Sequence, residues 1–514
     1  MSYGSFSQSK PKASLLAMAI ALIVVLLAVV ALFNLVPFLF VFYRSVVAML
    51  LTGLVWIVPL LLFAVLGFVA MYAAENGREG PKFIAGSVAA VLLVTSVIAM
   101  VGSSYWNHRA LYNASDVTHE NTASSVSLSE RVPYDVASSV AHRSMGNTTG
   151  DLVGALRTVP STGQYDSLVK RRGILVGYEA AQEMRLPLYG TFNFERDVKF
   201  CDFDRDKAAK RFGGALGNNL EAAVYSKFAF WNPTFHVSED DALVVCQDAK
   251  TPIMYMPATK MAFNGLVSYR VPAGVVTYNG SNGDLAFSET MEINGTPLYP
   301  TSLAKDQREA LTTADGFWSR VLNKAGYDTT NKDGDDPNAS NPSEFSVFDV
   351  TSKRAQYVTP LLPRGSSTSV VALSQIDSQS VTAGKLNRLT VNAYDNPRQA
   401  TSTEAKSIIS DQLSGYKATG LTVFEVVPSL SGNWTASIGN NQSIKYRAVI
   451  NSDGKATLTD EKGSKLTAAP DEAGKKSADS IDLGKPLSSM SPDELKAAMN
   501  KITDELAKRA NSND

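Results

Sequence analysis

Apolar residues are concentrated near the start of the chain. Three long apolar runs lie within residues 13–102, and about four hundred mostly polar residues follow them without a comparable run. The runs extend from Ala13 to Phe42, from Val46 to Tyr72 and from Phe83 to Val101. Because about 20 apolar residues in a helix cross the hydrocarbon core of a bilayer, the pattern predicts three transmembrane helices at one end of a protein that otherwise works in water.

The lysine and arginine residues near the runs predict how the chain is oriented. Four of them lie before the first run or between the second and third, and two lie on the opposite side. Cytoplasmic flanks carry the excess of positive charge, so we expect a multi-pass protein of the plasma (cytoplasmic) membrane with a cytoplasmic N terminus and everything after Val101 outside. The four are Lys10, Lys12, Arg78 and Lys82, and the two are Arg44, in a tight loop, and Arg109.

Changes in composition divide the chain into six segments. The predicted segments are a cytoplasmic tail (1–12), a three-helix anchor (13–102), a Ser/Asn/Thr-rich stalk (103–130), an extracytoplasmic domain (131–466), a disordered linker (467–490) and an amphipathic C-terminal helix (491–510). Residues 328–343 are rich in Asp, Asn, Gly and Pro, which is typical of an exposed loop or of a boundary within the large domain.

Helical and strand patterns alternate irregularly in the large domain, which favours an α+β fold over regular βαβ units. Glycine-rich turns between β-rich runs predict two hairpins, at 275–288 and 444–458, and 421–427 is a further strand. Helical patterns are predicted at Leu152–Val159, Gly177–Glu183, Asp206–Lys227, Ser302–Ala325 and Ser402–Leu413.

Two cysteines and four histidines limit the chemistry of this domain. Cys201 and Cys246 are a disulfide candidate if the domain lies in an oxidising compartment, and two unrelated buried thiols are the alternative. The histidines form no metal-binding motif, and we expect neither a metal nor another cofactor. With a net charge of −1 there is no concentrated basic face, so we expect no nucleic-acid partner.

Phe230, Trp231 and Phe235 form a dense aromatic cluster that is either part of the core or, if exposed, a candidate binding surface. At the other end of the domain, the C-terminal segment places four apolar residues at spacings of four, three and four on an otherwise charged helix. That helix is either solvated or a partner helix that docks on another protein or on a second copy. Its apolar seam consists of Leu495, Met499, Ile502 and Leu506.

The segments Phe230–His236, Tyr278–Gly283 and Ile444–Leu458 resemble parts of large bacterial multi-span membrane proteins with PepSY-like extracytoplasmic modules. The resemblance covers residues 225–300 and 405–460. It implies an extracytoplasmic binding or regulatory domain, and it assigns no catalytic residue.

These patterns together predict a membrane-anchored extracytoplasmic binding or scaffolding protein of the cell envelope. Its partners would be the lipid bilayer and a protein, or a second copy, that associates through the spans or the C-terminal helix. No catalytic motif is evident, and an enzyme is the less favoured interpretation. The alternatives are an envelope hydrolase with carboxylate acid/base catalysis and an accessory subunit of a transporter or secretion complex.

Overall fold

A computed structural model defines the fold and describes most of the chain between residues 37 and 466. Described are 37–75, 79–120, 151–159, 164–170, 180–185, 197–247, 250–324, 326–329, 345–349, 354–364, 370–394, 402–415, 421–428, 433–440, 443–451, 453–460 and 464–466, with a few isolated residues elsewhere.

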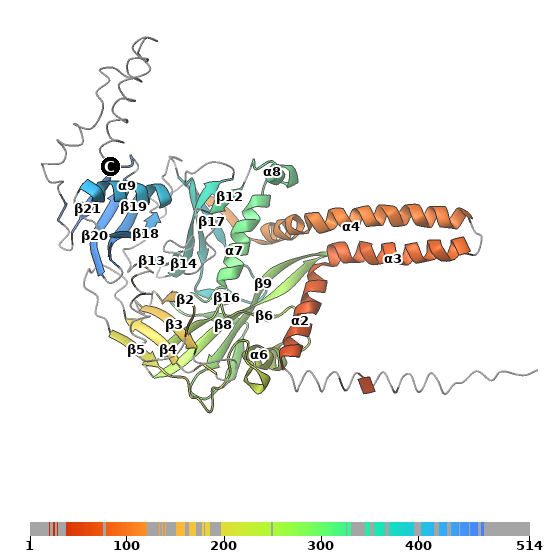
Figure 1. Ribbon diagram of the computed structural model, residues 1–514, viewed down its shortest axis with the longest axis horizontal. Coiled ribbons are helices and arrows are strands. Elements are labelled where there is room, and N and C mark those ends of the chain that lie inside the picture. The colour runs from red at the N-terminus through yellow and green to blue at the C-terminus, as the bar shows by residue number, and fades with distance from the viewer. Residues whose placement is uncertain are drawn as a thin grey trace, which may run out of the picture.

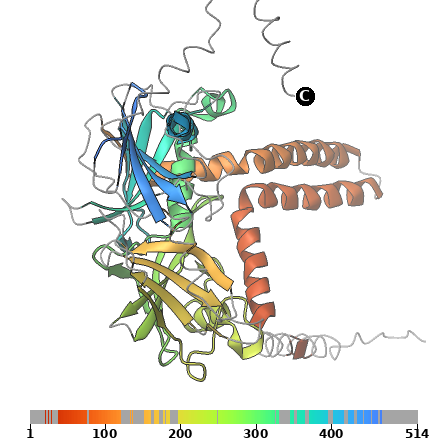
Figure 2. The same cartoon turned by 60° about the vertical axis from the view of Figure 1, so that its left-hand side comes forward.

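Three helices form the N-terminal part of the described chain. Helices α3 (Leu54–Glu75) and α4 (Glu79–Ala114) lie side by side as a hairpin that projects from one side of a large β-rich body. Helix α2 (Pro37–Thr52) runs along that side of the body, across the direction of the hairpin, as both views show (Figures 1 and 2). The chain therefore turns sharply at Gly53, between α2 and α3.

The structure corrects the prediction of three spans. In the described residues, one straight helix is long and apolar enough to cross a membrane, Leu54–Tyr72, and a second counts only if the bent helix α4 is one span. Arg44, predicted in a loop between two spans, lies inside α2, and the run from Val46 to Tyr72 is divided between two helices. The first predicted run lies mostly outside the described residues.

Five β-sheets make up the described body. One is the six-stranded sheet β1(Val117–Glu120)-β17(Leu389–Ala393)-β15(Ala372–Asp377)-β14(Arg354–Pro363)-β12(Tyr327–Thr329), with β13(Phe345–Asp349) also paired to β14. A second is β10(Leu285–Ser288)-β9(Val267–Asn279)-β8(Thr251–Asn264)-β6(His236–Val237), with β7(Leu243–Gln247) on β8. The third and fourth are β2(Asp151–Val159)-β3(Gln164–Lys170)-β4(Ala180–Arg185)-β5(Asp197–Cys201) and β18(Thr422–Pro428)-β19(Trp434–Asn440)-β20(Ser443–Ile450)-β21(Ala456–Thr459). The last is the pair β11(Thr290–Glu292)-β16(Ser380–Thr382).

Helices and predominantly antiparallel sheets occur together, so the predicted α+β class is confirmed. Helix α6 (Leu220–Phe228) packs with the β8–β9 sheet, and α7 (Thr301–Ala310) packs between that sheet and the β14–β17 sheet. Helix α9 (Ser402–Gly415) covers the C-terminal sheet. Strands β12 and β13 both pair with β14, so residues 328–343 connect two strands of one sheet rather than separate two cores.

The first part of the predicted stalk is structured. Helix α4 continues through residues 103–114 into the body, where Tyr105 and Leu111 are buried, and β1 then pairs in parallel with β17. Polar composition suggested a linker, but Leu111 joins the core that contains Leu389 and Val391. The linker prediction is therefore wrong for residues 103–120, and residues 121–130 lie outside the described residues.

Two short predicted helices are strands. Leu152–Val159 falls in β2 and Gly177–Glu183 overlaps β4, where each strand pairs with β3. Of the predicted helix Asp206–Lys227, only the end lies in an α-helix, since α6 begins at Leu220. The side chain of Asn219 caps α6 by accepting a hydrogen bond from Ala222 N at 2.8 Å. In these segments long-range strand pairing and glycine-containing turns override weak helical periodicity.

The two predicted hairpins and the predicted helix at 402–413 are confirmed. Strands β9 and β10 pair around a tight turn in which Gly283 has a φ of +77°, a value that L-residues rarely adopt. Strands β20 and β21 form the second hairpin, and α9 matches the predicted helix at 402–413. The predicted helix 302–325 is present in pieces, as α7, a 3-10 turn (Leu311–Thr313) and α8 (Phe317–Val321).

Candidate functional site at the junction of anchor and domain

Arg44 fixes α2 to the body. It is the one basic residue of this apolar helix, it is 3% exposed, and it points into the loop that follows α6. Its guanidinium donates to the carbonyl oxygens of Ala229 at 2.7 Å, of Asn232 and of Phe235 at 3.3 Å. The same group lies 4.4 Å from the centre of the Tyr225 ring. Among the described residues Arg44 meets backbone carbonyls and no carboxylate, so its positive charge is not neutralised there.

Arg109 holds α4 in the same way on the other side of the hairpin. Its Nη1 donates to the carbonyl oxygens of Thr313 at 2.6 Å and of Ala314 at 2.8 Å, in the turn that leads into α8. Helix α4 bends by 59° between Ser87–Met100 and Gly102–Ala114, so the projecting half and the half inside the body have different directions. Arg44 and Arg109 thus fix α2 and α4 to two different loops of the body.

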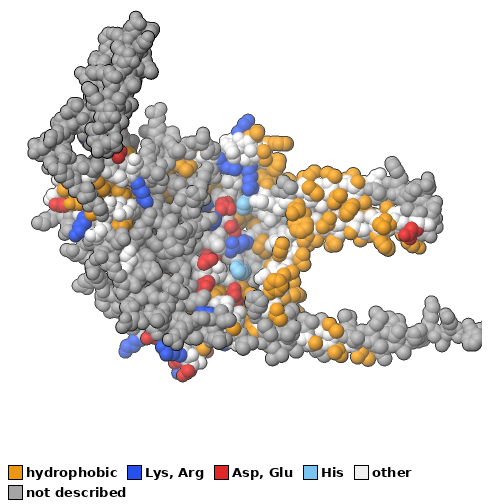
Figure 3. Space-filling view, viewed as in Figure 1, with side chains coloured by type: hydrophobic (Ala, Val, Ile, Leu, Met, Phe, Trp, Pro, Cys, Tyr) orange, Lys and Arg blue, Asp and Glu red, His pale blue; other side chains and the backbone are white. Residues whose placement is uncertain are grey.

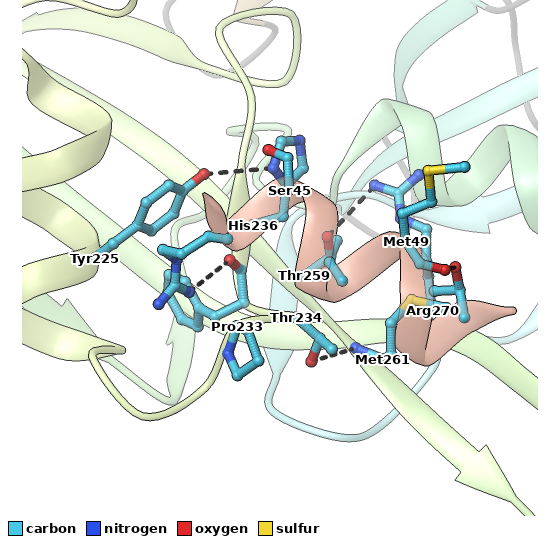
Figure 4. A pocket seen from close by; sticks show the side chains of 13 residues that line it. Ser45, Met49, Tyr225, Pro233, Thr234, His236, Thr259, Met261 and Arg270 are labelled. Carbon is cyan, nitrogen blue, oxygen red and sulfur yellow. Dashed lines mark hydrogen bonds between the residues drawn. The ribbon is translucent and has the colours of Figure 1, made fainter. Parts of the chain in front are cut away.

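A pocket of about 290 Å³ lies between α2 and the body. Ser45 and Met49 of α2 form one wall, and side chains of β6, β8 and β9 form the other (Figure 4). On this second wall the Tyr225 hydroxyl lies 3.4 Å from His236 Nδ1, and Arg270 Nη2 donates to Thr259 Oγ1 at 3.4 Å.

The pocket is lined by cationic and neutral groups. Arg44 and Arg270 both line it, and none of the described residues that line it is an Asp or a Glu. Desolvation, aided by the nearby Arg270, lowers the pKa of His236, so this imidazole is neutral at pH 7. Asp306 partly balances Arg270 from outside the pocket, at 3.0 Å. The arrangement suits an anionic or hydrogen-bond-accepting group and disfavours a cation.

Among the described residues, no pair of carboxylates, which a hydrolase with carboxylate acid/base catalysis would need, lines the pocket. Burial raises the pKa of Glu221 and of Asp306, but neither lines the pocket, and Asp306 is paired with Arg270. In the part of the chain that the structure describes, no three His, Cys, Asp or Glu side chains gather to hold a metal ion.

No protein family, curated protein or solved structure matches this chain. The resemblance to proteins with PepSY-like modules therefore stays a prediction, and the site is interpreted from its own geometry.

The predicted aromatic cluster is divided by the structure. Phe230 and Trp231 are 50% and 91% exposed, whereas Phe235 is buried in the core beside Phe287. For Phe235 the core alternative therefore holds, and the binding-surface alternative is wrong for that residue.

The two cysteines lie buried in the same core cluster, Cys201 at the end of β5 and Cys246 in β7. Their shared location is compatible with either of the predicted states, so the disulfide stays a prediction. The partner-helix seam of Leu495, Met499, Ile502 and Leu506 lies outside the described residues.

His108 makes the stability of the junction depend on pH. It lies on the inner half of α4, with Nε2 3.8 Å from Glu309 Oε2, and burial together with Arg320 lowers its pKa against the opposing effect of Asp306. The unfolded chain binds a proton at about pH 6.5 and the folded chain only at lower pH, so stability falls as the pH drops below about 6.5.

We expect the melting temperature to decrease from pH 7 to pH 5.5, with His108 contributing at most about 1.4 kcal/mol per pH unit. The variant His108→Gln should show a shallower decrease, as measured by tryptophan fluorescence during heating in detergent. Equal decreases in the variant and in the natural protein would contradict this assignment.

Proposed function

We propose that the chain is a membrane-anchored binding or scaffolding protein of the cell envelope, with the α3–α4 hairpin in the bilayer and the α+β body outside the cytoplasm. The observation that carries the proposal is that no part of the apolar stretch Leu54–Tyr72 is buried within the protein. A helix that is apolar all round and not covered by protein is stable in lipid. At 22 residues α3 is roughly 33 Å long, enough to cross the hydrocarbon core.

The body is attached rigidly to the hairpin, which favours a scaffold over a tethered domain. The inner half of α4 contributes Leu111 to the core, β1 pairs beside β17 at the edge of the sheet, and Arg44 and Arg109 each bind two or more carbonyl oxygens. A ligand in the pocket beside α2 would therefore contact the anchor and the body at once. This supports a binding function at the membrane surface.

Charge supports the orientation. Arg44 and Arg109, the two basic residues counted on the outer side, are held in bonds to the body. At the tip of the α3–α4 hairpin, on the other side, the sequence has Arg78 and Lys82. Positive charge at the tip favours a cytoplasmic tip and a body outside the cytoplasm. A cytoplasmic N terminus, with Lys10 and Lys12 on the same side as the tip, requires one more crossing before α2.

The anchoring proposal predicts different reactivities for two exposed positions. Leu61 on α3 is 61% exposed and Val449 on β20 is 40% exposed. Leu61→Cys and Val449→Cys are therefore a matched pair of exposed positions, the first expected in lipid and the second in water. In vesicles we expect a water-soluble maleimide to label Leu61→Cys roughly tenfold or more slowly than Val449→Cys, because lipid excludes water from α3.

Denaturation in urea and ionic detergent should bring the two rates together. The natural protein, whose two cysteines are buried, provides the background. Equal labelling of the two variants in vesicles would refute the anchoring proposal. An accessory-subunit role would show in addition as a larger membrane protein that co-purifies in stoichiometric amount.

A further inference from the structure

Among the described residues, the exposed large apolar side chains of the body lie, with one exception, in three short segments. Of the nine such side chains in the described residues after Ala114, only Val449 lies elsewhere. We call the other eight the interfacial collar. They are Phe230, Trp231, Phe263, Leu266, Phe317, Trp318, Val321 and Leu322. A soluble protein rarely exposes apolar residues in so concentrated a way.

All three segments of the collar lie at the base of the hairpin. Phe230 stacks on Phe40 of α2 with ring centres 5.8 Å apart, and Phe317 packs edge-on against Tyr105 of α4 at 5.2 Å. The β8–β9 turn, which carries the third segment, reaches α4 where Ser268 N donates to Asn107 Oδ1 at 3.4 Å. In the space-filling view, hydrophobic side chains continue from the hairpin onto this side of the body (Figure 3).

The collar has the same unit on both sides of the hairpin. Phe230-Trp231 and Phe317-Trp318 are each a pair of rings packed edge to face, with centres 4.9 Å and 5.3 Å apart. Arg44 positions the loop of the first pair through Ala229 O, and Arg109 positions the loop of the second through Ala314 O. In both pairs the Trp is the more exposed member, 91% for Trp231 and 71% for Trp318.

We infer that the interfacial collar lies in the headgroup region of the bilayer and fixes the body at a set depth and angle against the membrane. Tryptophan prefers this region because its ring is apolar and its N–H can bond to headgroups or water. A row of charged side chains lies behind the collar, on the side away from the hairpin (Figure 3), as expected where the surface passes from lipid to water.

The surroundings of the hairpin favour lipid over a protein partner. The collar flanks the hairpin through both α2 and α4, so whatever surrounds the hairpin also meets the collar. Helix α2 lies across the hairpin, and Phe42, Met49 and Leu50 are exposed along it, as in a helix that lies in the plane of an interface. The inference rests on the proposed function, since the collar can lie in a headgroup region only if the hairpin lies in a bilayer.

Depth-dependent quenching of tryptophan fluorescence tests the inference. The chain has five tryptophans, of which Trp434 is buried in the C-terminal sheet and Trp56 is in α3. The full chain would be placed in vesicles of phosphatidylcholine and phosphatidylglycerol with bromine either near the headgroup or near the chain end. We expect the double variant Trp231→Phe/Trp318→Phe to lose about half of the quenchable fluorescence, mostly that quenched by shallow bromine, and Trp434→Phe to lose none.

Two results would contradict the inference that the interfacial collar lies in the headgroup region. One is a double variant that loses no more quenchable signal than Trp434→Phe while aqueous acrylamide quenches Trp231 and Trp318, which would place them in water. The other is protection from both bromine and acrylamide, which would mean that a second copy or another protein covers them. In either case continued quenching of Trp56 by lipid would leave the anchoring proposal standing, whereas loss of that quenching would refute the proposed function itself.

Discussion

Replacing Arg44 by methionine should lower the stability of the body by about 3 kcal/mol. The substitution removes the donors for the carbonyl oxygens of Ala229, Asn232 and Phe235 and leaves these acceptors partly buried beneath α2. For a protein of 514 residues we expect a decrease of about 3 °C in melting temperature. The measurement is tryptophan fluorescence during heating of the purified protein in detergent.

Arg388→Met is the matched control. Arg388 Nε also donates to an acceptor near the anchor, Asp116, but both side chains are more than half exposed. Exposed ion pairs contribute about 0–1 kcal/mol, so this variant should melt close to the natural protein. If Arg44→Met and Arg388→Met melt alike, Arg44 does not clamp α2 to the body.

Gly283→Ala should disrupt the β9–β10 hairpin far more than Gly384→Ala. The two glycines have nearly the same backbone angle, with φ of +77° and +76°. A Cβ at Gly283 would lie 2.0 Å from the carbonyl oxygen of Lys207, whereas at Gly384 it would meet nothing within 4 Å. The left-handed conformation alone costs about 1–2 kcal/mol for alanine, and forcing the backbone apart at Gly283 should add about 1–3 kcal/mol.

Gly384→Ala measures the backbone strain alone, and Gly283→Ala measures the backbone strain together with the steric contact. Thermal unfolding of both variants gives the two effects. Equal melting temperatures for Gly283→Ala and Gly384→Ala would show that the turn shifts without cost and would contradict the close packing against Lys207.

Local patterns in the sequence predicted the parts of the fold that local chemistry determines. The turn at Gly283 and the strands beside it follow from alternating residues around glycines, and helix α9 follows from its periodicity. The short apolar segments of β2 and β4 fit either a helical or a strand period, and only the pairing of these strands with β3 decides between the two.

The junction was harder to predict because its residues are far apart in sequence. Arg44 and Ala229 are 185 positions apart, and nothing local shows that they meet. Two signals were available. One is the isolated arginine in an apolar run, which normally needs specific partners, and the other is the repeated dipeptide, Phe230-Trp231 and Phe317-Trp318. Composition indicates a stalk over residues 103–130, yet Leu111, in the first part of that segment, belongs to the core.

The most direct test of the membrane-anchored account is the sidedness of the hairpin tip relative to the body. Glu75, at the end of α3, and Asp206, on the body, are both exposed and can be replaced singly by cysteine. In intact cells that express the protein, a membrane-impermeant maleimide should label Asp206→Cys at once and Glu75→Cys only after lysis. Labelling of both in intact cells, or of Glu75→Cys alone, would contradict a body held outside the cytoplasm by a hairpin that crosses the membrane.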